Sequence, residues 1–160
     1  MSKLNFFKQT LILVLLVITN NVVAGQTSKH TGTVYATPVK NLMPLGNGDG
    51  VLLMQSSGIV AMSGDPPTIH AITCAGMGLE KPDESITSEF FCTLKENDKD
   101  SFDIKGKSTD QKDGEMDTGE FEVIGGSGKW AGATGKGTFI RVIQSEEGNK
   151  NIFEVEITVP

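Results

Sequence analysis

The sequence predicts an all-β protein built from eight antiparallel strands. Runs of strand-favouring residues recur at the spacing of β-hairpins, and clusters of Gly, Pro, Asn and Asp separate them. Several runs alternate apolar and polar residues, as antiparallel strands with one wet face do. Beyond the N-terminal segment, helical periodicity is weak. Eight such strands form either a closed barrel or a sandwich of two sheets.

Turn signals separate the first four strands. The first contains Thr-Val-Tyr and ends near Pro38, and the Gly-Asn-Gly-Asp-Gly run at 46–50 leads into the second. Pro66 and Pro67 end the second strand, and the Lys-Pro-Asp-Glu run at 81–84 follows the third. The expected strands are residues 31–39, 51–62, 68–79 and 89–96.

The last four strands are bounded in the same way. A short polar turn follows residue 96, a loop lies at 108–115, and Glu-Glu-Gly-Asn at 146–149 precedes the final strand. In that strand Phe153, Val155, Ile157 and Val159 share one face, which we expect to be the inner one, and Glu154, Glu156 and Thr158 share the other. The expected strands are residues 101–107, 117–124, 138–145 and 151–159.

The second strand is apolar on both faces, at Val-Leu-Leu-Met (51–54) and at Ile-Val-Ala-Met (59–62). A strand of this kind needs cover outside the sheet as well as inside it. Either a second subunit or the N-terminal segment of the same chain would provide that cover.

A glycine-rich segment lies between the sixth and seventh strands. Such density of glycine indicates a built turn with positive-φ positions, over which the single tryptophan caps one end of the fold. A dinucleotide site would require a helix to begin here, and the following glycines cannot sustain one. The residues of this structural signature are Gly125, Gly126, Gly128, Trp130, Gly132, Gly135 and Gly137.

The run Gly-Gly-Ser-Gly-Lys-Trp at 125–130, followed by Gly135, resembles the signature shared by allene oxide cyclases and dirigent proteins. The resemblance implies a calycin-like, eight-stranded antiparallel β-barrel that assembles as a trimer, which favours the barrel over the sandwich. The functional residues of those families lie outside the signature. The resemblance therefore assigns no catalytic residue to this chain.

Cys74 and Cys92 are the only cysteines. Pairing them centres a hairpin on Asp83, so that the two would face each other on adjacent strands, next to Ile72, Phe90 and Leu94. An exported domain with one such pair is expected to form a disulfide. Free buried thiols are one alternative, and a metal site with His70 is another, although a fourth ligand is not evident.

The N-terminus has the pattern of a signal peptide. Lys3 and Lys8 precede an apolar run at 11–18, which is shorter than the roughly 20 residues of a membrane-spanning helix. Small residues before Gly25 suggest cleavage after Ala24, so that 25–160 is a single domain in the periplasm or outside the cell. The formal net charge of −6 argues against nucleic acid and anionic membranes as partners.

Two functions fit this sequence. The first is an exported, non-catalytic barrel that binds a small apolar ligand or a protein partner. The second is a cyclase-like or dirigent-like enzyme, which would need a carboxylate inside the barrel, whereas Glu120 and Glu122 are expected outside and Glu89 lies on a strand. We predict no catalytic, cofactor-binding or metal-binding residue, and we expect His30 in a mobile N-terminal tail.

Overall fold

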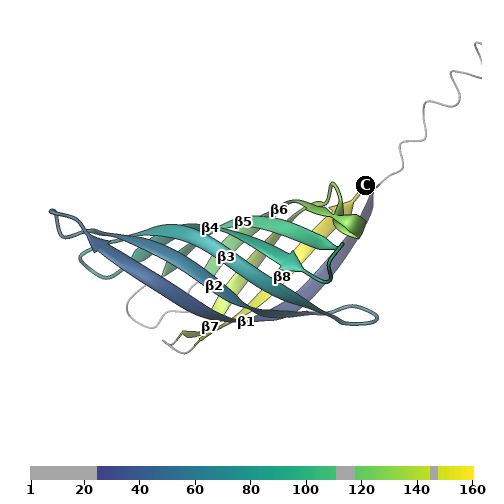
Figure 1. The fold of residues 1–160 in the computed structure, drawn as a ribbon, viewed down its shortest axis with the longest axis horizontal. Coiled ribbons are helices and arrows are strands. Elements are labelled where there is room, and N and C mark those ends of the chain that lie inside the picture. The colour runs from purple at the N-terminus through teal and green to yellow at the C-terminus, as the bar shows by residue number, and fades with distance from the viewer. Residues whose placement is uncertain (1–24, 111–117, 145–147) are drawn as a thin grey trace, which may run out of the picture.

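A computed structural model describes residues 25–110, 118–144 and 148–160 of the chain. Eight strands close into one antiparallel barrel in which each strand pairs with its neighbours in sequence and β1 pairs with β8 (Figure 1). The predicted fold class is confirmed. In the described part of the chain, no helix has the length and apolar character needed to cross a membrane. The strands are β1 (Gln26–Pro44), β2 (Gly50–Met62), β3 (Thr68–Glu80), β4 (Ile86–Lys95), β5 (Ser101–Asp110), β6 (Thr118–Ser127), β7 (Thr134–Gln144) and β8 (Asn149–Val159).

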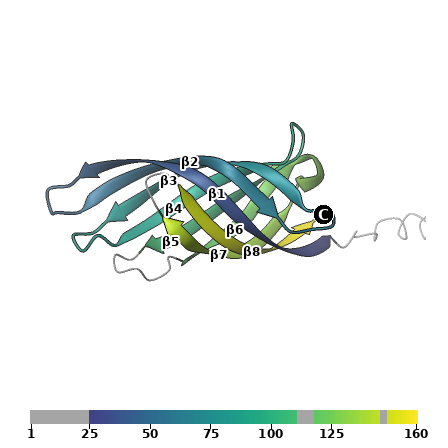
Figure 2. The same cartoon turned by 90° about the horizontal axis from the view of Figure 1, so that it is seen from below.

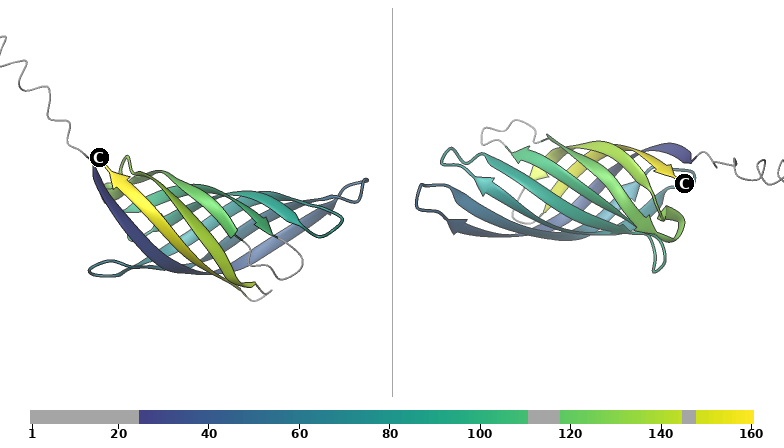
Figure 3. Two further views of the ribbon diagram at one scale, coloured as in Figure 1. Left: turned by 180° about the vertical axis from the view of Figure 1, so that it is seen from behind. Right: turned by 90° about the horizontal axis from the view of Figure 1, so that it is seen from above.

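The barrel is elongated, and its two ends differ (Figures 1 and 2). One end, called the capped end, holds the C-terminus, the β2–β3 and β4–β5 turns and the short 3₁₀ helix η1 (Gly128–Trp130). The other, called the open end, holds the β1–β2 and β3–β4 turns, and the β1–β2 hairpin projects furthest there (Figure 3). Because the strands differ in length, the hairpins at the open end extend to different heights along the barrel axis.

β1 is much longer than the sequence predicts. Residues 26–36 pair with β8 and residues 32–44 pair with β2, so that β1 is hydrogen-bonded along both edges. The expectation that His30 lies in a mobile tail is wrong. His30 Nε2 lies 2.8 Å from Ser28 Oγ, and His30 Nδ1 lies 3.1 Å from the Ser63 carbonyl oxygen.

The glycine-rich segment is only partly a turn. β6 continues to Ser127 and β7 begins at Thr134, earlier than the expected residue 138. Gly135 and Gly137 pair with Ile157 and Val155 of β8, so these two glycines belong to a strand. The turn is confined to the η1 region between the strands.

The inner face of β8 agrees with the predicted alternation. Phe153, Val155 and Ile157 are buried in the core, and Val159 packs against it half-buried. Glu154 and Glu156 are exposed on the outer face. The buried core fills the capped half of the barrel and includes Val60, Met62, Ile72, Leu94, Phe102, Ile104, Phe121, Val123, Trp130, Ala133 and Phe139.

Four inward-facing phenylalanines each lie over a glycine on the neighbouring strand. In all four pairs the two residues are direct partners in the register, and a Cβ added to the glycine would overlap the phenylalanine ring. Large and small residues thus alternate around the interior, which is how small barrels fit bulky side chains into a narrow space. The pairs are Phe90 with Gly106, Phe121 with Gly137, Phe139 with Gly119, and Phe153 with Gly32.

The outer surface has two contrasting walls. On the charged wall, lysines and glutamates alternate from strand to strand, as in the row Lys105, Glu122, Lys136, Glu156 and Lys29. On the apolar wall, made by the outer faces of β2 and β3, no outward position carries a charge. The outward residues of the apolar wall are Val51, Leu53, Gln55, Ser57, Ile59, Ala61, Ile69, Ala71, Thr73, Ala75, Met77 and Leu79.

Candidate functional site: the barrel cavity

The interior is not completely filled. A cavity of about 150 Å³ lies inside the barrel, between the packed core and the open end. A dry cavity of this size holds a benzene ring, whereas binding sites for drug-sized molecules are two to six times larger. The site therefore fits one ring or a short aliphatic chain.

Most of the cavity wall is aromatic or aliphatic. Phe102 and Ile104 line it on the side of the core, and Phe90, Phe139 and Phe153 line its middle. The paired glycines let these rings lie against the neighbouring strands. An apolar wall of this kind binds apolar groups by removing their surface from water.

The predicted disulfide between Cys74 and Cys92 is present, and its two cysteines line the cavity. They are direct partners across β3 and β4, and the connecting turn contains Asp83, as the spacing predicts. Cys92 is buried and Cys74 is half-buried. The disulfide is thus part of the inner wall and not a clamp on the outside of the barrel.

Polar side chains line the cavity toward the open end. Arg141 and Asn151 are direct partners on β7 and β8, Asn149 is the preceding inward residue of β8, and Lys40 lies near the end of β1. Among the described residues, the Oδ1 atoms of Asn149 and Asn151 are buried and have no hydrogen-bond partner. Of the described side chains that line the cavity, none is Asp or Glu.

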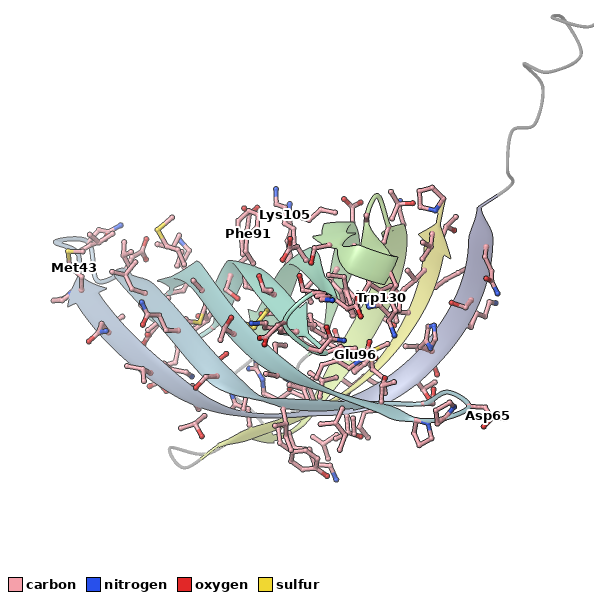
Figure 4. All side chains as sticks on the ribbon, turned by 45° about the vertical axis from the view of Figure 1, so that its right-hand side comes forward. Met43, Asp65, Phe91, Glu96, Lys105 and Trp130 are labelled. Atoms are coloured by element: carbon pink, nitrogen blue, oxygen red, sulfur yellow. A yellow bond between two sulfur atoms is a disulfide. The ribbon has the colours of Figure 1, made fainter. Side chains whose placement is uncertain are left out.

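Three aromatic side chains close the capped end. Trp130 is 9% exposed and its ring centroid lies 5.0 Å from that of Phe102, which also lines the cavity. Phe102 in turn meets His70 edge to face at 5.8 Å. Lys129, beside Trp130, forms an ion pair with Glu96 at 2.6 Å, and Figure 4 shows Glu96 and Trp130 together at this end.

His70 is a fully buried polar residue. Its Nε2 lies 2.9 Å from Thr68 Oγ1, and its Nδ1 has no hydrogen-bond partner among the described residues. Burial lowers the pKa of His70 below its usual value, since desolvation disfavours the charged ring, and this outweighs the opposing effect of Glu96. His70 therefore favours its neutral form within the core.

The glycine signature positions the cap. Gly125, Gly128 and Gly132 have positive φ, and a Cβ on Gly126 would press on Ser101 and Trp130. The carboxylate of Asp100 accepts a hydrogen bond from the Lys129 backbone N–H at 3.0 Å, which ties η1 to the β4–β5 turn. Hydrogen bonds from Asn97 and from Lys129 lower the pKa of Asp100.

The other candidate carboxylates lie outside the barrel. Glu89 forms an ion pair with Lys107 at 3.4 Å, Glu122 forms one with Lys136 at 3.9 Å, and Glu120 is exposed beside them. Within the described ranges, no group of three or more metal-ligating side chains comes together. Sequence reasoning missed Lys40, Arg141, Asn149 and Asn151 because each looks like an ordinary surface residue until the register places it on the inner face.

Together, the closed eight-stranded barrel and its lined interior define a β-barrel with a cavity. A search of solved structures finds a pterocarpan synthase dirigent protein with the same fold, at a TM-score of 0.54 and 9% sequence identity, covering 88% of this chain and 92% of that one. The chain thus has the dirigent-like barrel fold. No protein-family model matches the sequence. No curated protein matches it either.

Proposed function

We propose that this protein is an exported binding protein that holds a small apolar molecule inside its barrel without transforming it. The observation that supports this is the cavity, which is apolar in its deep part and bounded by rings and a disulfide. A cavity of about 150 Å³ is large enough for a ring. The internal disulfide supports the part of the proposal that concerns export, since such bonds persist in oxidising compartments.

Thermal unfolding in the presence of toluene tests the binding proposal. A ligand that binds only the folded state raises the melting temperature as its concentration increases. We expect toluene to raise the melting temperature of the native protein and to have no effect on Ala36→Phe, because Ala36 lines the cavity and a larger side chain would fill it.

Thr37→Phe is the matched control. Thr37 is the next residue of the same strand and is exposed on the outer face, so this variant should respond to toluene like the native protein. A native protein that does not respond, or an equal response in Ala36→Phe, would contradict the proposal.

A second candidate is a cyclase-like or dirigent-like enzyme. The shared fold with a dirigent protein favours it. Against it, the described lining of the cavity supplies no carboxylate to donate or accept a proton. Turnover of an added phenolic radical or epoxide substrate by the purified protein, faster than in buffer, would favour the enzyme over the binding protein.

We further propose that the protein self-associates, as a trimer, through the apolar wall. Leu53, Ile59, Ile69 and Met77 are each about half exposed or more, and none of the twelve outward positions of this wall is charged. Monomeric soluble proteins rarely expose a contiguous apolar surface of this kind. The charged wall of this barrel has the charged outer residues that are usual on a solvated sheet face. A second copy of the chain supplies a matching uncharged surface.

A further inference from the structure

The polar side chains of the cavity are grouped on one side. Arg141 of β7 pairs with Asn151 of β8, and Asn149 pairs with Ala36 of β1. Lys40 lies two inward positions beyond Ala36, about 13 Å further along the strand. The cavity therefore has an apolar inner part and a polar strip that runs from its middle to the open end.

The charge of this strip has one sign among the described residues. Lys40 and Arg141 are the charged side chains in the lining, and both are cationic. A guanidinium and an ammonium group bind carboxylates through charge-assisted hydrogen bonds. Arg141 is partly buried, so salt and water screen its charge less than that of a fully exposed group.

The two asparagines add hydrogen-bonding capacity that the protein does not use. The buried Oδ1 atoms of Asn149 and Asn151 have no partner among the described residues, and an unsatisfied buried acceptor is costly. A half-turn of either amide places its Nδ2 donors at the same position. These amides can thus serve the polar head of a bound molecule in either orientation.

We propose that the ligand of this barrel is a small amphipathic organic acid. Its ring or short chain lies among Phe90, Phe139 and Phe153, and its carboxylate faces Arg141 and Lys40, with Asn149 and Asn151 completing the contacts of the head group. This inference rests on the proposed binding function and adds the chemical class of the ligand.

Three probes with the same ring and chain but different head groups test the inference: 4-phenylbutyrate, 4-phenylbutanol and 4-phenylbutylamine. We expect titration calorimetry at pH 7 to show the acid binding at least about tenfold more tightly than the amine, with the alcohol between them. Lys40→Gln and Arg141→Gln should each weaken the acid by about tenfold or more and leave the alcohol nearly unchanged. Asn151→Asp should reduce or reverse the preference for the acid.

Lys29→Gln provides the matched control. Lys29 is on the same strand, faces outward near the capped end and is highly exposed, so its removal changes the net charge without touching the cavity. It should bind the acid like the native protein. Circular dichroism confirms that each variant is folded. If Arg141→Gln does not fold, Lys40→Gln still tests the inference, because Lys40 is exposed and its substitution should not affect folding.

The outcomes separate the two proposals. Equal binding of all three probes, or a preference for the amine, would overturn the inference about the head group while leaving the binding function standing. An acid that binds Lys40→Gln as tightly as the native protein would also overturn it. Binding of none of the probes, together with the absence of a toluene effect, would overturn both.

Discussion

The ring of Phe121 lies over Gly137, its direct partner on the adjacent strand, in the space where any other residue would carry a Cβ. The same arrangement recurs in three further pairs around the interior. The glycines of these strands are therefore part of the core packing, since each makes room for a ring.

Gly137→Ala should lower the free energy of unfolding by roughly 1–3 kcal/mol, because the new methyl group overlaps the ring of Phe121 and the Glu154 carbonyl. Urea denaturation measures the change. Gly46→Ala is the control, since a Cβ at Gly46 would meet nothing within 4 Å and should leave stability almost unaltered. Equal stability of the two variants would show that the ring does not occupy this space.

Removal of the disulfide by Cys74→Ala together with Cys92→Ala should cost about 3 kcal/mol, since the bond closes a loop between residues 18 positions apart. The melting temperature of the native protein should fall when a reductant is added, whereas that of the double variant should not change. Mass spectrometry that finds two free thiols in non-reduced protein would rule out the bond.

Trp130→Ala should lower the free energy of unfolding by roughly 3–5 kcal/mol, because the buried ring packs on Phe102 and closes the capped end. Its emission in the native protein should be blue-shifted and resistant to acrylamide. Ile124→Ala, at an exposed position of β6, should change stability by no more than about 0.5 kcal/mol. A red emission that acrylamide quenches readily would mean that the ring is exposed.

Stability should decrease as the pH falls below the unfolded-state pKa of histidine, about 6.5. Burial lowers the pKa of His70 in the folded protein, so the unfolded chain binds more protons between the two pKa values. The contribution of His70 is complete above pH 6.5 and is lost progressively down to its folded pKa. Glu96, Lys129 and His30 modify this shift but do not reverse it.

Urea denaturation at several pH values between 8 and 5 tests this expectation. His70→Leu should show a weaker dependence on pH over that range than the native protein, whatever its absolute stability. An identical pH dependence in both proteins would show that His70 does not remain neutral in the core.

Ile69→Lys should dissociate the protein to monomers, because Ile69 is the most exposed large apolar side chain of the uncharged outer surface of β2 and β3, where it lies beside the β2–β3 turn. Light scattering at high micromolar concentration should report an oligomer for the native chain and a monomer for this variant. Ile124→Lys makes the same change on the charged wall and should leave the oligomer intact. A native protein that is monomeric under these conditions would remove the basis for the proposal.

Alternation and hairpin register are local properties, and they predicted all eight strands, the inner face of β8 and the pairing of Cys74 with Cys92. Predictions failed where distant strands decide the outcome. The first strand begins before His30 because β8 pairs with it there, and it continues to Pro44 because β2 pairs with its other edge, which no local pattern reveals. Gly137 was assigned to a turn because its reason for being glycine, the ring of Phe121, lies on another strand.

The cavity was unpredictable for a related reason. Whether a barrel interior contains a cavity depends on the summed volumes of the inward side chains from all strands. It also depends on the register, which decides which of these side chains lie at the same height along the barrel axis. Lys40 and Asn151 look like solvated residues in the sequence. Only closure of the barrel turns them toward a shared space.

The inward orientation of the Cys74–Cys92 bond has a kinetic consequence. Because its sulfur atoms belong to the cavity wall, a reducing thiol must enter the barrel to attack them. The rate of reduction by thiols of increasing width therefore gauges the aperture of the open end. A molecule already seated inside would act as a plug, and the half-life of the bond would lengthen with its residence time.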